Sequence, residues 1–320
     1  MIKVEGLTIS IKKKAQTYAL LRDVNFSLEQ GQTLSLVGES GSGKSLITYA
    51  VLGMLNHLEG LEGVVGLPGQ KNVLRLSSKE LRRFRREQIG YIPQNPRECL
   101  TPTLKVGSQL TEVIAVKTDR SVRAGRLIAR DLLQSLGFPD PEKVLKMYPH
   151  QLSGGMCQRV AIAMAVVSRP ALVVADEPTS SLDLLIKQEI IKVIKSVQTE
   201  QGFALILVTH DLDLAFNCSN KIAVVYGGRL VETGTAHNLS NKPRHPYTRS
   251  LVRCSSRTGA DKSIHYIPGE PVSIYTRFKG CRYFNRCLSR LEICETREPA
   301  WVNLGDGQVA CWHYGRDEST

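Results

Sequence analysis

GESGSGKS, residues 38–45, is the most informative stretch of the chain. It follows the apolar run TLSLV and precedes KSLITYAVLGML, whose apolar residues recur at helical spacing. Its glycines let backbone N–H groups close around phosphate oxygens at the positive end of a helix. A chance glycine-rich turn would not combine strand, loop and helix in this order, so a phosphate-binding loop is predicted. The residues predicted to contact nucleotide here are Gly38, Glu39, Ser40, Gly41, Ser42, Gly43, Lys44 and Ser45.

Two side chains of this loop have defined chemistry. Lys44 can neutralise the β- and γ-phosphates of a nucleotide, and the Ser45 hydroxyl can bind Mg²⁺. A second acidic motif, VVADEP, places Asp176 at the end of an apolar strand. Its carboxylate is expected at the carboxyl edge of the sheet, where it can hold Mg²⁺. Glu177 can then orient or deprotonate the attacking water. A surface Asp-Glu pair is the alternative, but such a pair would not normally end an apolar strand.

The stretch LSGGMCQR, residues 152–159, offers a second set of bare backbone N–H groups at a helix start. One chain does not need two phosphate cradles for one nucleotide. We therefore interpret this stretch as a cradle for the γ-phosphate of a nucleotide held by a partner subunit. A helix capped by Ser153 and opened by a tight Gly-Gly turn would look similar and remains an alternative.

Composition limits the class of protein. The chain has 320 residues, a net charge of +12 and 42% hydrophobic residues, which suits a soluble globular protein with one large or two smaller domains. We expect no signal peptide and no membrane span, and hence a cytosolic protein in which structural disulfides are disfavoured. The charge is compatible with nucleic acid, anionic membrane or nucleotide as a partner. The densest basic run, residues 79–87, is interpreted as a solvated helix face.

The remaining chain alternates strands and helices. Strands are predicted within residues 1–30, and mainly helix from 79 to 150. The fully apolar runs at 171–176 and 203–209 are typical of central strands of a parallel sheet. KIAVVYGGRLVETG, residues 221–234, is a hairpin signal because two apolar runs meet at Gly-Gly. From 241 onward proline and cysteine increase and long apolar helices vanish, so we expect a domain boundary there.

With these motifs in order, the chain resembles the ATPase subunits of ABC transporters. LSGGMCQR is similar to the ABC signature, ADEPTSSLD to the extended Walker B motif and D-loop, YIPQNP to the Q-loop and LVTHDL to the switch-histidine strand. HPYT (245–248), PGEP (268–271) and the tail cysteines resemble the oligopeptide, dipeptide and nickel importers in particular. The resemblance implies an α/β P-loop ATPase domain over 1–240 with a helical subdomain at about 90–155, and a small C-terminal domain over 241–320.

The resemblance also implies roles within one chain. Tyr18 would stack on adenine, with a core aromatic as the alternative, and Gln94 would bridge Mg²⁺ or water and a membrane partner. His210 would hydrogen-bond the γ-phosphate and link it to Glu177. Because Lys44 and these catalytic positions are present, hydrolytic competence is expected. Ligands implied for Mg²⁺ are Ser45, Gln94 and Asp176.

Other implied roles reach across a dimer. Ser153, Gly154 and Gly155 would contact ATP bound by the opposite subunit, and Asp183 would help form the dimer seam. The loop QNPRECLTP departs from the family pattern. Arg97 and Cys99 in this loop would face a membrane subunit or solvent, so contacts with a membrane subunit would be particular to this protein.

Four of the eight cysteines lie in the tail, with five, six and sixteen residues between successive members: Cys281, Cys287, Cys294 and Cys311. A zinc site usually pairs cysteines two to four residues apart, whereas iron–sulfur ligands can be spread through loops. The resemblance implies a 4Fe-4S cluster, with Zn²⁺ or unmetallated thiols as alternatives. His313 is a possible substitute ligand.

The implied function is that of an ATP-hydrolysing subunit of a peptide importer on the cytoplasmic face of the inner membrane. It would dimerise with a similar but distinct ATPase and act on two permease subunits, served indirectly by an extracytoplasmic solute-binding protein. A nickel-chelate or other small-solute importer is the alternative. A soluble ABC ATPase acting on nucleic acid is less favoured, because such proteins usually carry two ATPase modules or a coiled-coil insertion. A metal sensor with vestigial nucleotide binding is disfavoured by intact Glu177 and His210.

Overall fold

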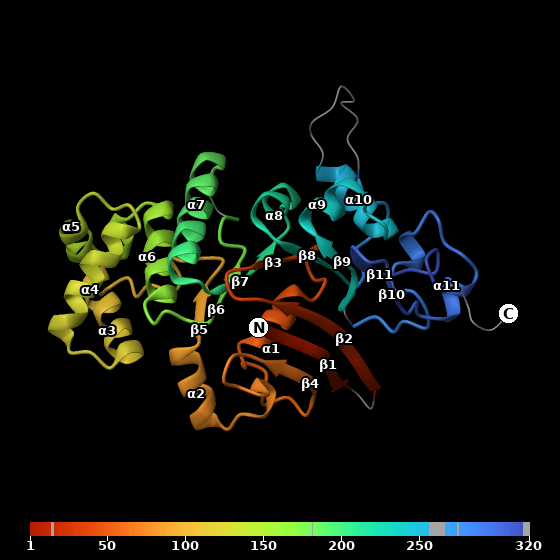
Figure 1. Ribbon diagram of the computed structural model, residues 1–320, viewed down its shortest axis with the longest axis horizontal. Coiled ribbons are helices and arrows are strands. Elements are labelled where there is room, and N and C mark those ends of the chain that lie inside the picture. Colours follow the sequence, from red (N-terminus) through yellow and green to blue (C-terminus); the bar gives the residue numbers. More distant parts are fainter. Residues whose placement is uncertain (14–15, 181, 256–265, 274, 316–320) are drawn as a thin grey trace. The chain divides into compact units, whose positions relative to one another are not determined.

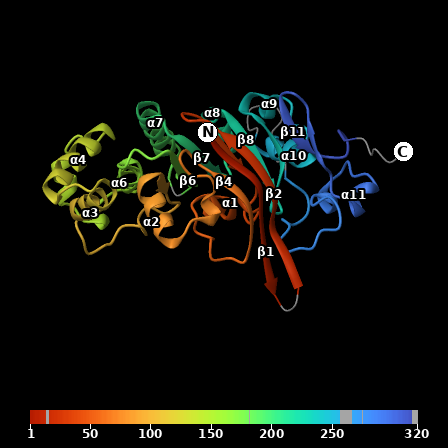
Figure 2. The same ribbon diagram turned by 60° about the horizontal axis from the view of Figure 1, so that its bottom comes forward.

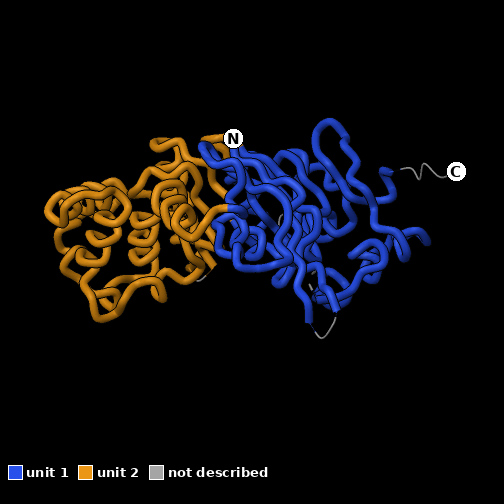
Figure 3. The backbone as a smooth tube through the Cα atoms, turned by 90° about the horizontal axis from the view of Figure 1, so that it is seen from below, with its two compact units in different colours: residues 1–28, 33–75, 208–320 blue, residues 29–32, 76–207 orange. Residues whose placement is uncertain are grey.

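The computed structural model describes residues 1–13, 16–180, 182–255, 266–273 and 275–315. Two compact units make up the chain (Figure 3). The first unit is built from residues 1–28, 33–75 and 208–320, and the second from 29–32 and 76–207. The tail beyond residue 240 therefore belongs to the same compact unit as the phosphate loop.

A three-stranded antiparallel sheet forms one part of the first unit. Its strand order is β2-β1-β4, with β1 at Ile2–Lys13, β2 at Gln16–Leu28 and β4 at Gly60–Gly66. Figure 2 shows β1 and β2 as a long paired ribbon. Alternation in IKVEGLTIS buries Ile2 and Val4 on one face, and a register shift after Val4 interrupts the alternation. The strands predicted within residues 1–30 are confirmed.

A second sheet in the first unit carries the phosphate loop. Within this unit its order is β10-β11-β9-β8-β3, and β3 runs parallel to β8 while the other neighbours are antiparallel (Figure 1). The predicted hairpin at 221–234 is confirmed as β8 and β9. The tail strand β11 pairs with β9, so the tail extends this sheet. The bounds are β3 Thr33–Val37, β8 Lys221–Tyr226, β9 Arg229–Thr235, β10 Trp301–Asn303 and β11 Gly307–Ala310.

Tyrosines join the tail to the core of the first unit. Tyr247 of the tail packs on Tyr226 at the end of β8, with ring centroids 4.6 Å apart, and Tyr283 packs edge-on to Tyr226 at 5.1 Å. All three rings are buried. The helices of this unit are α1 Lys44–Val51, η1 Val73–Arg75, α8 Leu212–Cys218, α9 Ala236–Asn241, α10 Pro246–Ser255, η3 Phe284–Arg286 and α11 Ile293–Thr296.

The second unit combines helices with strands in the order β7-β6-β5, and β5 runs parallel to β6. The fully buried runs β6 and β7 confirm the predicted central strands. The bounds are α2 Ser78–Glu87, β5 Ile89–Ile92, α3 Val106–Thr118, α4 Val122–Ser135, α5 Pro141–Lys146, η2 Pro149–Gln151, α6 Gly154–Val166, β6 Leu172–Asp176, α7 Leu184–Gln201 and β7 Ala204–Thr209, which crosses into the first unit at Val208.

Two local outcomes bear on the sequence interpretation. The basic run 79–87 lies in α2, where Ser77 and Glu80 form a capping box and Glu87 pairs with Arg83 and Arg86, so a solvated helix face is confirmed.

The mainly helical prediction for 79–150 missed β5. Four residues are too short to show a period, and β5 forms because it pairs along β6.

Candidate nucleotide-binding site

The phosphate loop lies between β3 and α1. All five residues of β3 are buried, and α1 begins at Lys44. Gly43 has φ +110°, and a Cβ there would lie 3.2 Å from the Cα of Gly228 and 3.0 Å from Leu21, so the turn requires glycine. The predicted order of strand, glycine loop and helix is confirmed.

Lys44 is held at this loop rather than in solvent. Its Nζ donates to the carbonyl oxygens of Gly38 at 2.8 Å and Glu39 at 2.9 Å, and the residue is only 6% exposed. Ser45 follows it and is exposed. A positive charge fixed beside backbone N–H groups is suited to binding phosphate oxygens.

The acidic motif, Asp176 and Glu177, lies beside Gln94 in the second unit. Asp176 ends β6 and is buried, and Glu177 follows it half-buried. Gln94 Nε2 donates to the Glu177 carboxylate at 3.2 Å. Glu177 also has φ +44°, a conformation that costs a non-glycine residue about 1–3 kcal/mol and is characteristic of functional sites. The Glu177 backbone is thus fixed in a strained turn that aims its carboxylate at the Q-loop residue.

The signature stretch begins α6 in the second unit. Ser153 is its N-cap, and the Ser153 Oγ accepts a hydrogen bond from the N–H of Met156 at 3.2 Å. A Cβ on Gly155 would lie 2.9 Å from Ile186 of α7, so the Gly-Gly pair also permits close helix packing. Asp183 caps α7 by accepting from the N–H of Ile186 at 3.0 Å. Ser153 therefore forms the helix cap described by the alternative interpretation, while its role toward the nucleotide of a partner subunit stays a prediction.

Arg97 has a partner that the sequence did not reveal. Although the residue is exposed, its guanidinium donates to the carbonyl of Leu152 at 3.2 Å, immediately before the signature serine. The expectation that Arg97 faces only a membrane subunit or solvent is thus incomplete, whereas Cys99 is exposed as expected. The Q-loop and the signature stretch are linked by this bond within one unit.

Tyr18 and His210 belong to the first unit. Tyr18 is half-buried on β2. Its ring lies edge-on to the ring of Tyr275 with centroids 6.3 Å apart, and the Arg277 guanidinium lies 5.6 Å from the Tyr18 ring centroid. His210 follows β7 and is exposed, and the next residue, Asp211, caps α8. The tail neighbours of Tyr18 were missed because they lie more than 250 residues away in the chain.

The four tail cysteines line one small cavity, together with His313 and His245. All four are free thiols, and the N–H of Cys281 donates to the carbonyl of Cys294 at 2.8 Å. His313 Nε2 lies 2.6 Å from the Ser289 carbonyl oxygen. Within the described ranges, no three histidine, cysteine or acidic side chains are already arranged as a metal-binding group. The structure thus gathers the predicted ligands around one space.

Burial controls the ionisation of these thiols. It is the main reason that the pKa of Cys281 is raised to about 12, and the nearby charges of Cys294, Cys311 and Cys287 contribute to this rise. Burial also raises the pKa of Cys287 and of Cys311. Without a nearby cation, the thiols of Cys281, Cys287 and Cys311 would stay protonated at neutral pH, because burial and the repulsion between neighbouring negative charges both disfavour the thiolate form. The donor set suits a cationic metal centre that favours thiolates.

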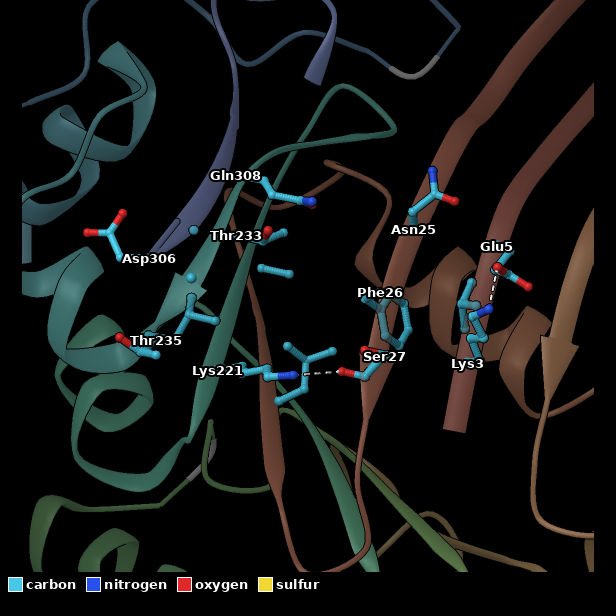
Figure 4. A pocket seen from close by; sticks show the side chains of 16 residues that line it. Lys3, Glu5, Asn25, Phe26, Ser27, Lys221, Thr233, Thr235, Asp306 and Gln308 are labelled. Carbon is cyan, nitrogen blue, oxygen red and sulfur yellow. Dashed lines mark hydrogen bonds and ion pairs between the residues drawn. The ribbon is translucent and has the colours of Figure 1, made fainter. Parts of the chain in front are cut away.

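A separate cavity of about 440 Å³ opens in the first unit between β1 and β2 on one side and β8, β9 and β11 on the other (Figure 4). Lys3 pairs with Glu5 at 2.7 Å beside it, and Lys221 donates to the Ser27 carbonyl at 3.5 Å. Its lining comes from strands and from the turn before β11, not from the phosphate loop. We do not assign this cavity to the nucleotide.

Two sequence families match the chain. The ABC transporter family matches residues 21–180, and the oligopeptide/dipeptide transporter C-terminal region matches residues 231–294. The chain is 38% identical to the dipeptide transport ATP-binding protein DppD of Escherichia coli (strain K12), across 100% of this chain and 98% of that protein. It is 37% identical to the oligopeptide transport ATP-binding protein OppD of Bacillus subtilis (strain 168), across 96% of this chain and 86% of that protein.

Solved structures agree with this assignment. The dimeric ATP-binding cassette MJ0796 in a post-hydrolysis state, bound to ADP and Pi, matches with a TM-score of 0.63 and 29% identity, covering 74% of this chain and 99% of that chain. The cbiO1 structure from Clostridium perfringens matches with a TM-score of 0.65 and 26% identity, covering 76% and 91%. The α/β P-loop ATPase fold is confirmed. Since the first family match covers half of the chain and DppD aligns with all of it, the chain belongs to the ABC transporter ATPases, in the branch with the oligopeptide/dipeptide transporter C-terminal region.

Proposed function

We propose that this chain hydrolyses ATP to drive the import of peptides through a membrane complex. One observation carries the proposal: a complete set of nucleotide motifs shares one chain with the C-terminal region typical of oligopeptide and dipeptide transporters. Curated relatives named as dipeptide and oligopeptide transport ATP-binding proteins support the choice of cargo.

The residues of this chain would divide the chemistry as follows. Lys44 binds the β- and γ-phosphates, Glu177 accepts the proton of the attacking water, and His210 contacts the γ-phosphate. The gain from such a general base is about 10²- to 10⁴-fold. Mg²⁺ neutralises phosphate charge when bound, and the oxygen donors of Ser45, Asp176 and Gln94 are of the kind it prefers. Tyr18 stacks on the adenine.

A second ATPase subunit completes each nucleotide site. The signature helix start at Ser153, Gly154 and Gly155 presents N–H groups and positive helix potential to an anion, and no nucleotide in the same chain needs a second cradle. Asp183 would lie at the seam between the two subunits. A homologous but distinct ATPase is the partner we propose, which gives a heterodimer.

A groove on the second unit offers a docking place for a permease subunit. It has a volume of about 820 Å³ and lies among α3, α4 and α5. Val116 and Val122 line it and are 58% and 70% exposed. Arg123 and Arg126 also line it. Exposed apolar side chains with basic neighbours suit a short membrane-protein helix carrying acidic residues.

The proposed location is peripheral, on the cytoplasmic face of the cell membrane. In the part of the chain that the structure describes, no helix combines the length and apolar character required to cross a bilayer. Attachment would occur through two permease subunits, with a solute-binding protein on the opposite side and no role for nucleic acid.

We infer that Cys281, Cys287, Cys294 and Cys311 hold a 4Fe-4S cluster. Their thiols line one cavity, and burial disfavours the bare thiolate at most of them. The local helices are short, four residues in α11 and three in η3, so a metal centre would stabilise the tail in place of a large apolar core.

Protein purified without oxygen should be brown and contain iron and acid-labile sulfide in cluster stoichiometry. Cys294→Ser should lose the colour and most of the iron, because a buried ligand is removed, whereas Cys99→Ser, at an exposed position in the other unit, should keep both. Metal analysis and absorption spectroscopy provide the measurement. Colourless protein containing zinc would contradict the cluster.

Uptake of labelled dipeptide tests the proposed function. Cells that carry the chain together with its permease and solute-binding proteins should accumulate peptide, and Lys44→Ala should abolish accumulation while the complex still assembles. Labelled nickel chelate should not accumulate. Peptide uptake that continues with Lys44→Ala, or accumulation of nickel chelate instead of peptide, would contradict the proposal.

A further inference from the structure

The tail sequence CRYFNRC, residues 281–287, has a cysteine at each end and two arginines between them, and the two residue types contact different parts of the first unit. Cys281 and Cys287 at its ends line the cysteine cavity. Arg282 and Arg286, four residues apart, are each only 6% exposed and contact other parts of the first unit. Burying two arginines is costly unless each guanidinium is paired, so their partners are informative.

Arg286 is paired with the phosphate loop. Its two terminal nitrogens lie 2.6 Å and 3.0 Å from the two carboxylate oxygens of Glu39, in the bidentate arrangement that gives arginine–carboxylate pairs their strength and direction. The Arg286 Nε donates to the carbonyl of Pro268 at 2.8 Å. The Glu39 side chain is 23% exposed and that of Arg286 only 3%. Screening by solvent is therefore weak at this pair.

Tyr247, in the HPYT stretch, holds the same loop residue from another side. The backbone N–H of Glu39 donates to the Tyr247 hydroxyl at 2.9 Å. Tyr247 is fully buried and packs on Tyr226 and Tyr283, so its hydroxyl is fixed in place. Glu39 is thus tied to the tail by both its side chain and its backbone, while its carbonyl accepts from Lys44.

Arg282 acts on the other end of the loop through the turn between β8 and β9. Its guanidinium donates to the carbonyl of Gly227 and pairs with Glu298 at 3.2 Å. The N–H of the next turn residue, Gly228, donates to the carbonyl of Ser42 at 2.7 Å. The β8–β9 turn that Arg282 contacts is therefore hydrogen-bonded to the phosphate loop at Ser42, just before Lys44.

We propose that segment 281–287 is a positioning element for the phosphate loop, in which Arg286 fixes Glu39 and Arg282 fixes the turn that supports Ser42. A loop already held in its phosphate-binding shape loses less conformational freedom when ATP binds, so the tail raises ATP affinity. Cys281 and Cys287 bound this segment, so the residues that position the loop adjoin the cysteine cavity. The inference rests on the proposed role of this loop in ATP binding.

A double-mutant cycle on the full chain tests the pair. We expect Arg286→Met and Glu39→Gln each to weaken binding of a fluorescent ATP analogue by about tenfold, within the range of typical coupling between sites. The double variant should be no weaker than either single variant, because both remove one interaction. The rate of Arg286→Met at saturating ATP should change little, which separates positioning from catalysis. Arg290→Met is the matched control, since Arg290 lies over the ring of Phe284 at 5.3 Å in the same tail.

The outcomes separate the possible failures. Folded Arg286→Met with wild-type affinity would overturn the proposal. If Arg286→Met does not fold, Glu39→Gln decides, because it leaves the tail sequence intact, and unchanged affinity in that variant would also overturn it. Additive losses in the double variant would show two independent effects and reject the pair as the cause. If Lys44→Ala also binds the analogue as wild type does, the proposed nucleotide site is wrong, whatever the cycle shows.

Discussion

Glu177→Gln should leave ATP binding intact and slow hydrolysis by about 10²- to 10⁴-fold, the range that a general base contributes. The amide keeps the size of the carboxylate and can still bond to Gln94, which lies 3.2 Å from it, but it cannot accept the proton of water. Phosphate release at saturating Mg²⁺–ATP measures the loss, and nucleotide binding at equilibrium shows that affinity is kept.

Glu189→Gln is the matched control. Glu189 lies in α7 of the same unit, and its carboxylate pairs with Arg159 at 2.9 Å on the surface. Its loss should leave the rate near that of the wild type, because exposed pairs contribute about 0–1 kcal/mol to stability. Hydrolysis by Glu177→Gln at the rate of the control would show that another group is the base.

Ser153→Asp should be as stable as the wild type and should lose about 10²- to 10³-fold in hydrolysis by the dimer, the size of effect seen when one oxyanion donor is removed. Aspartate is a good N-cap, so it can accept from the Met156 N–H as serine does at 3.2 Å. Its charge, however, would repel the γ-phosphate held by the partner subunit. The prediction separates the capping role of Ser153 from its proposed role toward nucleotide.

Ser153→Thr retains a neutral hydroxyl cap and serves as the control, with most activity expected to remain. Thermal unfolding should give similar midpoints for all three proteins, and steady-state hydrolysis should single out the aspartate variant. If Ser153→Asp hydrolyses ATP as fast as Ser153→Thr, the signature helix start does not face a phosphate.

The nucleotide motifs could be predicted because their chemistry is local. A buried strand, a glycine loop and a helix are adjacent in sequence, and the phosphate loop in the structure follows that order. Asp176 at the end of β6 is equally local. Strand β5 could not be recognised from four residues, since its conformation depends on pairing with β6.

The contacts of the tail could not be predicted because they join distant residues. Glu39 and Arg286 are 247 positions apart, and each sequence neighbourhood alone shows an ordinary charged residue. The spacing of the tail cysteines likewise did not show that their side chains line one cavity. The net charge of +12 was compatible with nucleic acid, yet Arg282 and Arg286 are buried against carboxylates and carbonyls within the first unit. Their charges neutralise internal partners and are not presented to a polyanion.

The most direct test concerns the sharing of each nucleotide between two ATPase subunits. Specific ATPase activity should be measured over a dilution series, with the mass of the particle determined at each concentration. Activity per chain should fall as dimers dissociate and should return when a second ATPase subunit is added in excess. A constant specific activity at dilutions where the chain is a monomer would contradict the account, because a single chain would then complete its own catalytic site.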